Sequence, residues 1–170
     1  MTGTSGSHPT GMRGRAPGVK TSPLALAGFL VVSSLFAAES DWATYLGDPG
    51  STHYSELRQI DVSNVSRLQP AWTYNAGGRD PKNRSQIQCN PLVIAGVLFG
   101  TTPDQQAFAV DAASGKELWR FDPASIPGIT KGGVNRGLMY WSDPEQRGDR
   151  RIYYANDRFL HALDAGTGKR

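Results

Sequence analysis

The sequence predicts an all-β protein built from β-propeller blades, each of which is a sheet of four antiparallel strands. Three observations predict this fold class. Residues 90–121 contain four short apolar runs in succession, and part of this pattern returns 53 residues later. The chain also has 20 Gly and 11 Pro, which suits many tight turns between short strands.

The first blade is expected between Asn90 and Phe121. Its expected strands are residues 92–94, 97–99, 107–110 and 117–121. Ala95-Gly96 matches a two-residue hairpin turn, in which glycine takes the strained dihedral angles. Four strands of this length bury one face poorly alone, so the unit must stack on copies of itself.

A second copy of the third-strand turn supports this expectation. Ala162 to Lys169 repeats Ala109 to Lys116, a spacing typical of propeller blades, although two unrelated Asp/Gly turns are the simpler alternative. The further strands are expected at residues 138–141, 152–155 and 159–163. In the register of Trp119, the next outer-strand tryptophan would fall beyond Arg170. We therefore expect a second blade without its outer strand, and a chain that is the N-terminal part of a larger propeller.

The segment before the first blade is expected to contribute one strand. Ala71–Tyr74 resembles the end of residues 117–121, with Trp72 in the register of Trp119, and is predicted to be the outer strand of the closing blade. Both tryptophans are expected to pack between blades. Further upstream, residues 60–68 are predicted to hold one helical turn capped by Ser63.

Residues 1–38 have the pattern of a secretory signal peptide. Basic residues precede an apolar run, Leu24 to Phe36, that is too short to span a bilayer comfortably and is followed by Ala37-Ala38. A bulky residue occupies a cleavage position that is usually small, so an uncleaved membrane anchor is the alternative. We expect a periplasmic protein, exported by this signal, with the propeller region in residues 39–170.

The charge balance gives no support for nucleic-acid binding. The net charge of +3 comes from Arg13, Arg15 and Lys20, because 15 basic and 15 acidic residues lie from Glu39 onward. Cys89 is the only cysteine, so no intrachain disulfide is possible. We expect it to be a small buried hydrophobic residue rather than a catalytic thiol.

Several spaced motifs occur in order from Asp41 to the end of the chain. They are Trp42-x-x-Tyr45-x-Gly47-Asp48, Ala71-Trp72-x-Tyr74, the turn Asp-Ala-x-x-Gly-Lys-x-x-x-Trp, and Val134-Asn135-Arg136-Gly137-Leu138-x-Tyr140-Trp141. In this order they resemble the start of the quinoprotein dehydrogenases that depend on pyrroloquinoline quinone (PQQ).

The resemblance implies an eight-bladed propeller that holds PQQ and a calcium ion at one axial end. Such enzymes oxidise a small-molecule alcohol or sugar and pass electrons to cytochrome c or a membrane quinone. PQQ is a flat tricarboxylate ortho-quinone, so its site needs fixed donors for the carboxylates and a cation near the reactive carbonyl. In this family the calcium ligands and the catalytic aspartate come from later blades. We therefore expect no catalytic residue and no metal ligand before Arg170.

Two positions match cofactor-contacting positions of the family. Arg136 corresponds to the arginine that reaches the quinone oxygens, a role that suits a planar, permanently charged group. Its alternative is a loop arginine paired with a surface acid. Gln88 lies where the family often carries glutamate against the cofactor's polar edge, and its alternative is a plain strand-end amide.

The sequence also departs from one branch of this family. Relatives of methanol dehydrogenase place a disulfide between adjacent cysteines shortly before the arginine. Thr130-Lys131 stands near that place here, which favours a substrate other than methanol.

Other polar residues are expected to be structural. His53 and His161 invite a metal or acid/base role, but His161 alternates with apolar residues on a strand and is expected to face outward or to be satisfied. Asp111 and Asp164 are expected to hydrogen-bond the backbone of their own turns.

Two rival hypotheses come from other classes. One is a cofactor-free propeller scaffold of the bacterial envelope that binds proteins through its blades. The other is a fragment without independent activity, which is our expectation for the isolated chain.

Overall fold

The computed structural model describes residues 41–170 except residues 83, 130–132 and 147. The predicted signal in residues 1–38 and the Thr130-Lys131 pair lie outside this range. In the described part, no helix combines the length and the apolar composition needed to cross a membrane.

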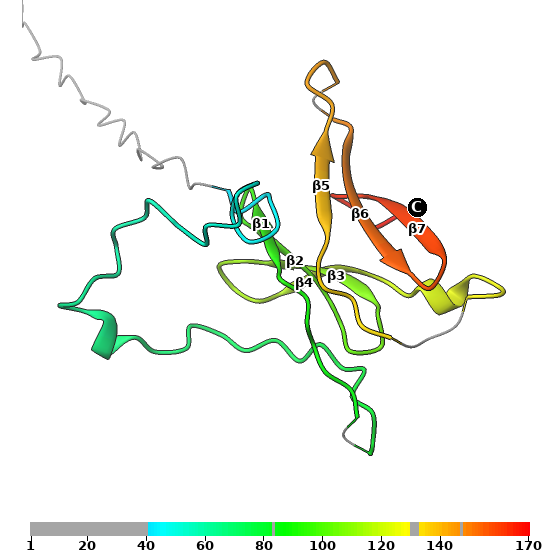
Figure 1. The fold of residues 1–170 in the computed structure, drawn as a ribbon, viewed down its shortest axis with the longest axis horizontal. Helices are drawn as coiled ribbons and strands as arrows, with labels where there is room; N and C mark the ends of the chain where they lie inside the picture. Colours follow the sequence, from blue (N-terminus) through cyan, green and yellow to red (C-terminus); the bar gives the residue numbers. More distant parts are fainter. Residues whose placement is uncertain (1–40, 83, 130–132, 147) are drawn as a thin grey trace, which may run out of the picture. The chain divides into compact units, whose positions relative to one another are not determined.

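The first predicted blade is confirmed as a four-stranded antiparallel sheet with the strand order β1-β2-β3-β4 (Figure 1). Its strands are β1 (Leu92–Ile94), β2 (Val97–Thr101), β3 (Ala107–Asp111) and β4 (Glu117–Phe121). The hairpin turn between β1 and β2 has positive φ at both Ala95 (48°) and Gly96 (75°), as a type I′ turn requires. The Ala95 N–H donates to Asp41 Oδ1 at 2.8 Å, which ties the turn to the N-terminal segment.

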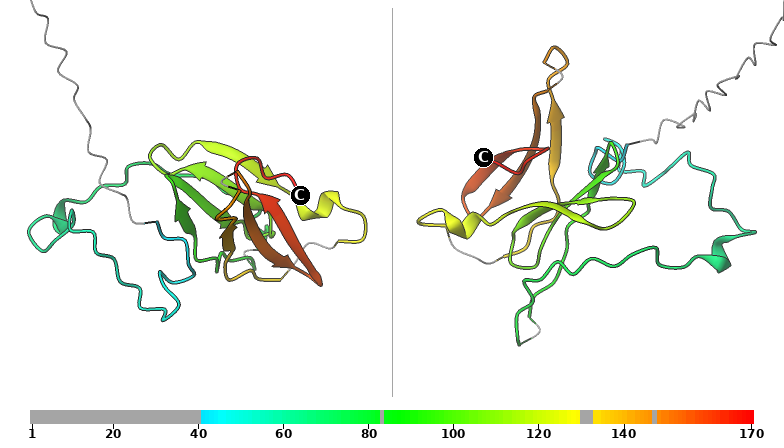
Figure 2. Two further views of the ribbon diagram at one scale, coloured as in Figure 1. Left: turned by 90° about the horizontal axis from the view of Figure 1, so that it is seen from above. Right: turned by 180° about the vertical axis from the view of Figure 1, so that it is seen from behind.

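The second sheet has three antiparallel strands in the order β5-β6-β7 (Figure 2). They are β5 (Met139–Ser142), β6 (Arg150–Asn156) and β7 (Phe159–Asp164). All three predicted strands are present, and β6 extends further at both ends than the sequence predicts. In the register of β6 and β7, Tyr154 lies opposite His161.

The two repeated turns are closed by aspartate, as predicted. Asp111 Oδ1 accepts hydrogen bonds from the backbone N–H (2.8 Å) and the hydroxyl (2.6 Å) of Ser114. Asp164 Oδ1 accepts the same pair from Thr167, at 2.8 and 2.6 Å. The pKa of both carboxyl groups lies below the usual value, and these hydroxyl contacts are the largest cause.

Trp119 on β4 packs against the turn that follows β7. Its indole Nε1 donates to the Ala165 carbonyl at 2.9 Å. The ring lies over Gly168, which has φ of 69° and where a Cβ would lie 2.6 Å from the indole. Glycine is therefore required both by the left-handed conformation and by the close approach of the ring. The predicted packing of Trp119 between sheets is confirmed.

Trp72 repeats this contact one sheet earlier. Its Nε1 donates to the Ala112 carbonyl at 3.0 Å, and a Cβ on Gly115 would lie 2.5 Å from the indole. The segment Ala71–Tyr74 has no strand assignment in the described structure. Its role as the outer strand of a closing blade stays a prediction, because the other strands of that blade were not expected among residues 41–170. The segment forms no backbone ladder with a described strand and is held by side-chain contacts instead.

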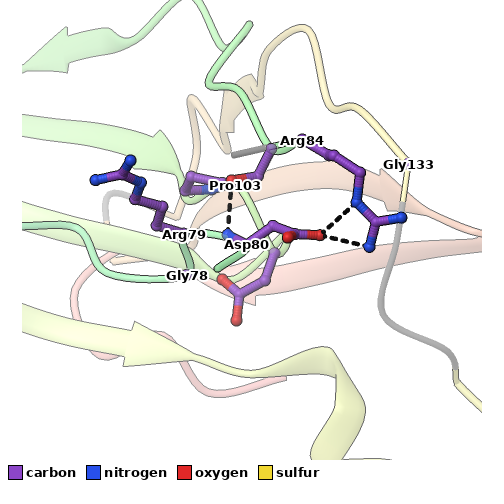
Figure 3. A pocket seen from close by; sticks show the side chains of 8 residues that line it. Gly78, Arg79, Asp80, Arg84, Pro103 and Gly133 are labelled. Carbon is purple, nitrogen blue, oxygen red and sulfur yellow. Dashed lines mark hydrogen bonds and ion pairs between the residues drawn. The ribbon is translucent and has the colours of Figure 1, made fainter. Parts of the chain in front are cut away.

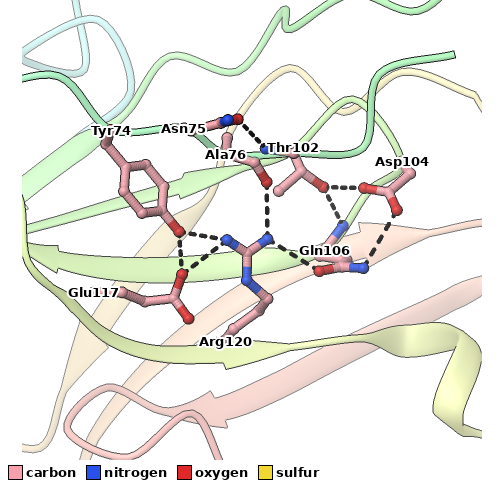
Figure 4. A network of polar contacts seen from close by, with 9 residues as sticks. Tyr74, Asn75, Ala76, Thr102, Asp104, Gln106, Glu117 and Arg120 are labelled. Carbon is pink, nitrogen blue, oxygen red and sulfur yellow. Dashed lines mark hydrogen bonds and ion pairs between the residues drawn. The ribbon is translucent and has the colours of Figure 1, made fainter. Parts of the chain in front are cut away.

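A polar network on β4 holds the same segment (Figure 4). Arg120 donates to the Ala76 carbonyl and to Gln106 Oε1, both at 3.0 Å. It also donates to Glu117 at 2.8 Å and to the Tyr74 hydroxyl at 2.5 Å. Burial, together with the hydrogen bond to Glu117, raises the pKa of Tyr74 to about 12. The Arg120 side chain therefore links three separate segments of chain.

The two helical turns in the described residues are short. They are η1 (Val65–Arg67) and η2 (Pro123–Ser125). The prediction that Ser63 caps the first turn was wrong, because Asn64 occupies the cap position without a side-chain cap bond. The Ser63 N–H instead donates to Asp61 Oδ1 at 2.7 Å, so a local aspartate turn competes with the cap.

Both sheets contribute to one hydrophobic core. Its buried members are Leu92, Ile94, Phe99, Ala107, Ala109, Trp119, Leu138, Ile152, Tyr154, Leu163 and Ala165. His161 lies on the same face of β7 as Leu163, and only 2% of it is exposed. Its ring stacks on Tyr154 with 5.0 Å between centroids. Its Nε2 has no hydrogen-bond partner in the described structure, so the prediction of an outward or satisfied histidine was wrong.

The buried indole of Trp119 generates a stability prediction. Trp119→Ala removes a packed ring and leaves a carbonyl without its donor, so the free energy of unfolding should fall by about 3–5 kcal/mol. Trp141 is 43% exposed on β5, and Trp141→Ala should change it by less than about 1 kcal/mol. Urea unfolding of the 170-residue chain measures both. Equal losses would contradict the inter-sheet role of Trp119.

The buried His161 generates a pH prediction. Burial lowers the pKa of His161 in the folded chain, with a smaller effect from Arg170. The unfolded chain therefore binds more protons as the pH falls through the unfolded value of about 6.5, and stability is lost on acidification below it.

His161→Phe keeps a stacked ring without a titrating nitrogen and should flatten the fall in stability between about pH 7.5 and about pH 5.5. His53→Asn is the control, because His53 is exposed and its φ of 58° suits asparagine. Chemical unfolding at several pH values measures the slope. An unchanged slope in His161→Phe, or a flattened one in His53→Asn, would contradict this origin.

Candidate functional site

The two segments that carry the predicted site residues lie side by side. One precedes β1 and the other precedes β5. The Asn90 N–H donates to the Arg136 carbonyl at 3.0 Å, and Asn90 forms an isolated parallel bridge with Gly137. The Asn90 side-chain amide also lies 3.5 Å from the same carbonyl. Residues 46 positions apart in the sequence are thus joined at the start of each sheet.

Arg136 is exposed, and its guanidinium has no hydrogen-bond or ion-pair partner in the part of the chain that the structure describes. It lines a cavity of about 410 Å³ together with Gln105, Asn135 and Tyr154, among others. Asp157 lines the same cavity and has an interaction of its own, but no ion pair joins it to Arg136 in the described structure. The planar fork is available to bind an oxygen-rich ligand.

Gln88 lies two residues before Asn90 and is half-buried. Its amide has no hydrogen-bond partner among the described residues. Gln88 is not among the residues that line the Arg136 cavity, and no contact joins the two side chains. The structure therefore brings their backbone segments together but not their polar groups, and the role of Gln88 stays a prediction.

Asn135 is a site residue that sequence reasoning missed. Its Nδ2 donates to the Ala155 carbonyl on β6 at 3.0 Å, and its Oδ1 accepts from the Gly137 N–H at 2.9 Å. These bonds fix the backbone on both sides of Arg136. The sequence did contain a signal for this turn, because an asparagine often accepts a hydrogen bond from the backbone N–H two residues later.

A buried amide pair lies at the same end of the sheets. Asn156 is 1% exposed and donates from Nδ2 to Gln105 Oε1. Gln105 is 4% exposed and has φ of 64°. The Oδ1 of Asn156 has no partner among the described residues. No sequence signal predicts this pair, because Gln105 lies in the loop between β2 and β3 and Asn156 lies on β6, 51 positions away.

Cys89 behaves as the sequence predicts. The thiol is half-buried and packs against the common core. Burial raises its pKa, which disfavours the thiolate that nucleophilic chemistry requires. A structural role therefore describes Cys89 better than a catalytic one.

The described residues do not fit a calcium site. They contain no group of three or more His, Cys, Asp or Glu side chains arranged to hold a metal ion. Calcium prefers six to eight oxygen ligands, so isolated carboxylates do not hold it well.

A second cavity, of about 420 Å³, is a weaker candidate (Figure 3). Its lining residues include Gly78, Arg79, Asp80, Arg84 and Asp104. Arg84 forms an ion pair with Asp80 at 3.0 Å, and both Arg79 and Asp104 have interaction partners. Because both of its arginines are already engaged, this cavity offers an anion no unpartnered cation.

Residues 42–170 match the family model described as "PQQ: Glucose/ethanol/alcohol dehydrogenase, beta-propeller domain". The chain belongs to this family. The match covers both sheets and the Trp42 motif, in agreement with the resemblance expected from the sequence.

Named relatives agree with the family. The dehydrogenase subunit of the alcohol dehydrogenase (quinone) of Gluconobacter oxydans is 38% identical over 135 residues, which cover 76% of this chain and 16% of that protein. The 1-butanol dehydrogenase (cytochrome c) of Thauera butanivorans is 31% identical over 158 residues, which cover 90% of this chain and 21% of that protein.

A solved structure shows the same fold. The quinohemoprotein alcohol dehydrogenase from Comamonas testosteroni aligns with a TM-score of 0.62 and 32% identity over 76% of this chain and 18% of that chain. The chain thus spans about a fifth of the length of the relatives that it matches.

The described residues fit PQQ as a partial site. A tricarboxylate needs donors that are not already engaged, and the Arg136 guanidinium meets that condition. The Gln88 amide is also unengaged among the described residues, but it does not line the same cavity. Arg136 offers five N–H groups in a fixed fork, which suits carboxylate or quinone oxygens.

Proposed function

We propose that this chain is the N-terminal part of an exported PQQ-dependent dehydrogenase that oxidises an alcohol or a sugar. Electrons pass from it to cytochrome c or a membrane quinone. One observation carries the assignment of a site. Arg136 presents an unpartnered guanidinium to a cavity, on a loop whose backbone is bonded to Asn90. The family assignment names the cofactor that this cation would meet.

Arg136 and Gln88 are the two residues of the chain that have a role at the cofactor in this proposal. Bound PQQ supplies a two-electron acceptor. Arg136 donates N–H groups to the cofactor's oxygens and favours negative charge on them, because a preorganised cation needs no reorganisation. Gln88 donates or accepts a neutral hydrogen bond at the cofactor's polar edge. The calcium ligands and the aspartate that takes the substrate proton are assigned to later blades, beyond Arg170.

The names of relatives support the substrate and acceptor classes. One relative is named as an alcohol dehydrogenase with a quinone and another as a 1-butanol dehydrogenase with cytochrome c. We place the protein in the periplasm, with residues 1–38 as signal or anchor and residues 39–170 as the first part of the propeller. This placement rests on the basic and apolar pattern of the N-terminus.

Arg136 generates the functional prediction. In the full-length enzyme, Arg136→Ala removes charge-assisted hydrogen bonds and should weaken PQQ binding by about 10- to 100-fold. Gln88→Ala removes a neutral bond and should cost about 3- to 10-fold. Titration of the apo-enzyme with PQQ, followed by fluorescence, measures both affinities. Reduction of an artificial dye with an alcohol or a sugar measures the activity.

The control is Arg151→Ala, because Arg151 on β6 is paired with Asp149 and does not line the cavity. It should leave PQQ affinity unchanged. Unchanged affinity and activity in Arg136→Ala would remove Arg136 from the mechanism. A full-length protein that binds no PQQ at all would favour the cofactor-free scaffold instead.

A further inference from the structure

The loop that carries Arg136 is held by the Asn135 side chain and by its own backbone, and not by the Arg136 side chain. Asn135 bonds to Ala155 on one side, and Asn90 bonds to the Arg136 carbonyl on the other. The guanidinium itself has no partner in the described structure. The point from which the Arg136 side chain extends is therefore fixed by the backbone from Asn135 to Gly137, and a group packed against this backbone helps to hold it in place.

Tyr45 is such a group. A Cβ on Gly137 would lie 2.9 Å from Tyr45 Cδ2 and 3.2 Å from Cε2, so the ring occupies the space of a side chain. Gly137 does not have a positive φ, so glycine is required here by space and not by backbone conformation. The Tyr45 hydroxyl also lies 3.4 Å from the Asn90 amide nitrogen. The ring thus contacts both segments of the candidate site.

Tyr45 is fixed in turn by the N-terminal segment. It lies in a β-turn closed by a 2.9 Å bond from the Gly47 N–H to the Thr44 carbonyl. The Trp42 ring packs on Gly47, where a Cβ would lie 2.8 Å away. Trp42 also exchanges two backbone hydrogen bonds with Val93 on β1, at 2.7 and 3.1 Å. A chain of contacts therefore runs from β1 through the turn to the Tyr45 ring.

We propose that Tyr45 is a positioning residue that holds the Arg136 loop in its binding conformation through Gly137 and Asn90. The inference rests on the proposed function, because it concerns the PQQ contact of Arg136. A displacement of about 1 Å at a binding group is enough to cost a large factor in rate or affinity. A ring packed against a glycine beside that group limits such displacement.

Substitutions at Tyr45 separate the ring from the hydroxyl. In the full-length protein, Tyr45→Ala should weaken PQQ binding by about 10-fold, and Tyr45→Phe should stay within about 2-fold, because the hydroxyl contact is long. Tyr54→Ala is the matched control, since Tyr54 is a tyrosine of the same N-terminal segment that is 66% exposed, against 38% for Tyr45. Equal effects of Tyr45→Ala and Tyr54→Ala on PQQ affinity would overturn the proposal.

Double substitutions test the route through Gly137. Gly137→Ala alone places a methyl group in the space that the Tyr45 ring occupies. The resulting steric clash should lower both the melting temperature of the apo-protein and its PQQ affinity. In the Tyr45→Ala background the ring is gone, so Gly137→Ala should cost much less in both measurements. Additive losses would overturn the steric coupling.

The double variant Tyr45→Ala/Arg136→Ala separates this inference from the proposed function. If Tyr45 acts through Arg136, the double variant should bind PQQ no more weakly than Arg136→Ala alone. Additive losses in affinity would contradict the positioning role only. Wild-type affinity in Arg136→Ala would contradict the proposed function itself, whatever the melting temperatures show for Tyr45 and Gly137.

Discussion

The contact on which the structure depends is a tryptophan packed on the aspartate-closed turn of the next sheet. Trp119 donates its indole N–H to the Ala165 carbonyl, and its ring covers Gly168. Trp72 makes the same contact with the preceding turn. One hydrogen bond and one glycine thus define the spacing between successive repeats. The bond between Asn90 and Arg136, each before the first strand of its sheet, depends on that spacing.

Most of the fold could be predicted, because its causes are local. Strands followed from apolar runs between turn residues, and the Asp111 turn from a residue that bonds its own backbone. The predictions failed where contacts made in the folded chain decide the environment of a residue. His161 alternates as a surface residue would, yet it is buried and its ring packs against Phe121 of the other sheet. Ser63 lost its cap role to Asp61.

The site was predictable in a different sense. Arg136 was found because a family motif surrounds it, and not from any property of arginine. The bonds that hold its loop, from Asn90 and Asn135, join segments far apart in the sequence and needed coordinates. The same is true of the Tyr45 ring on Gly137. Sequence identified the cation, and packing explains why the neighbouring positions carry glycine and asparagine.

The most direct test of the account is an experimental structure of the full-length enzyme with PQQ bound. The account predicts that a guanidinium nitrogen of Arg136 lies about 2.7–3.2 Å from a PQQ oxygen. It also predicts that the Asn90 N–H still donates to the Arg136 carbonyl in that complex. An Arg136 side chain directed to the rim, with every PQQ oxygen more than about 4 Å away and no bridging water, would contradict the account.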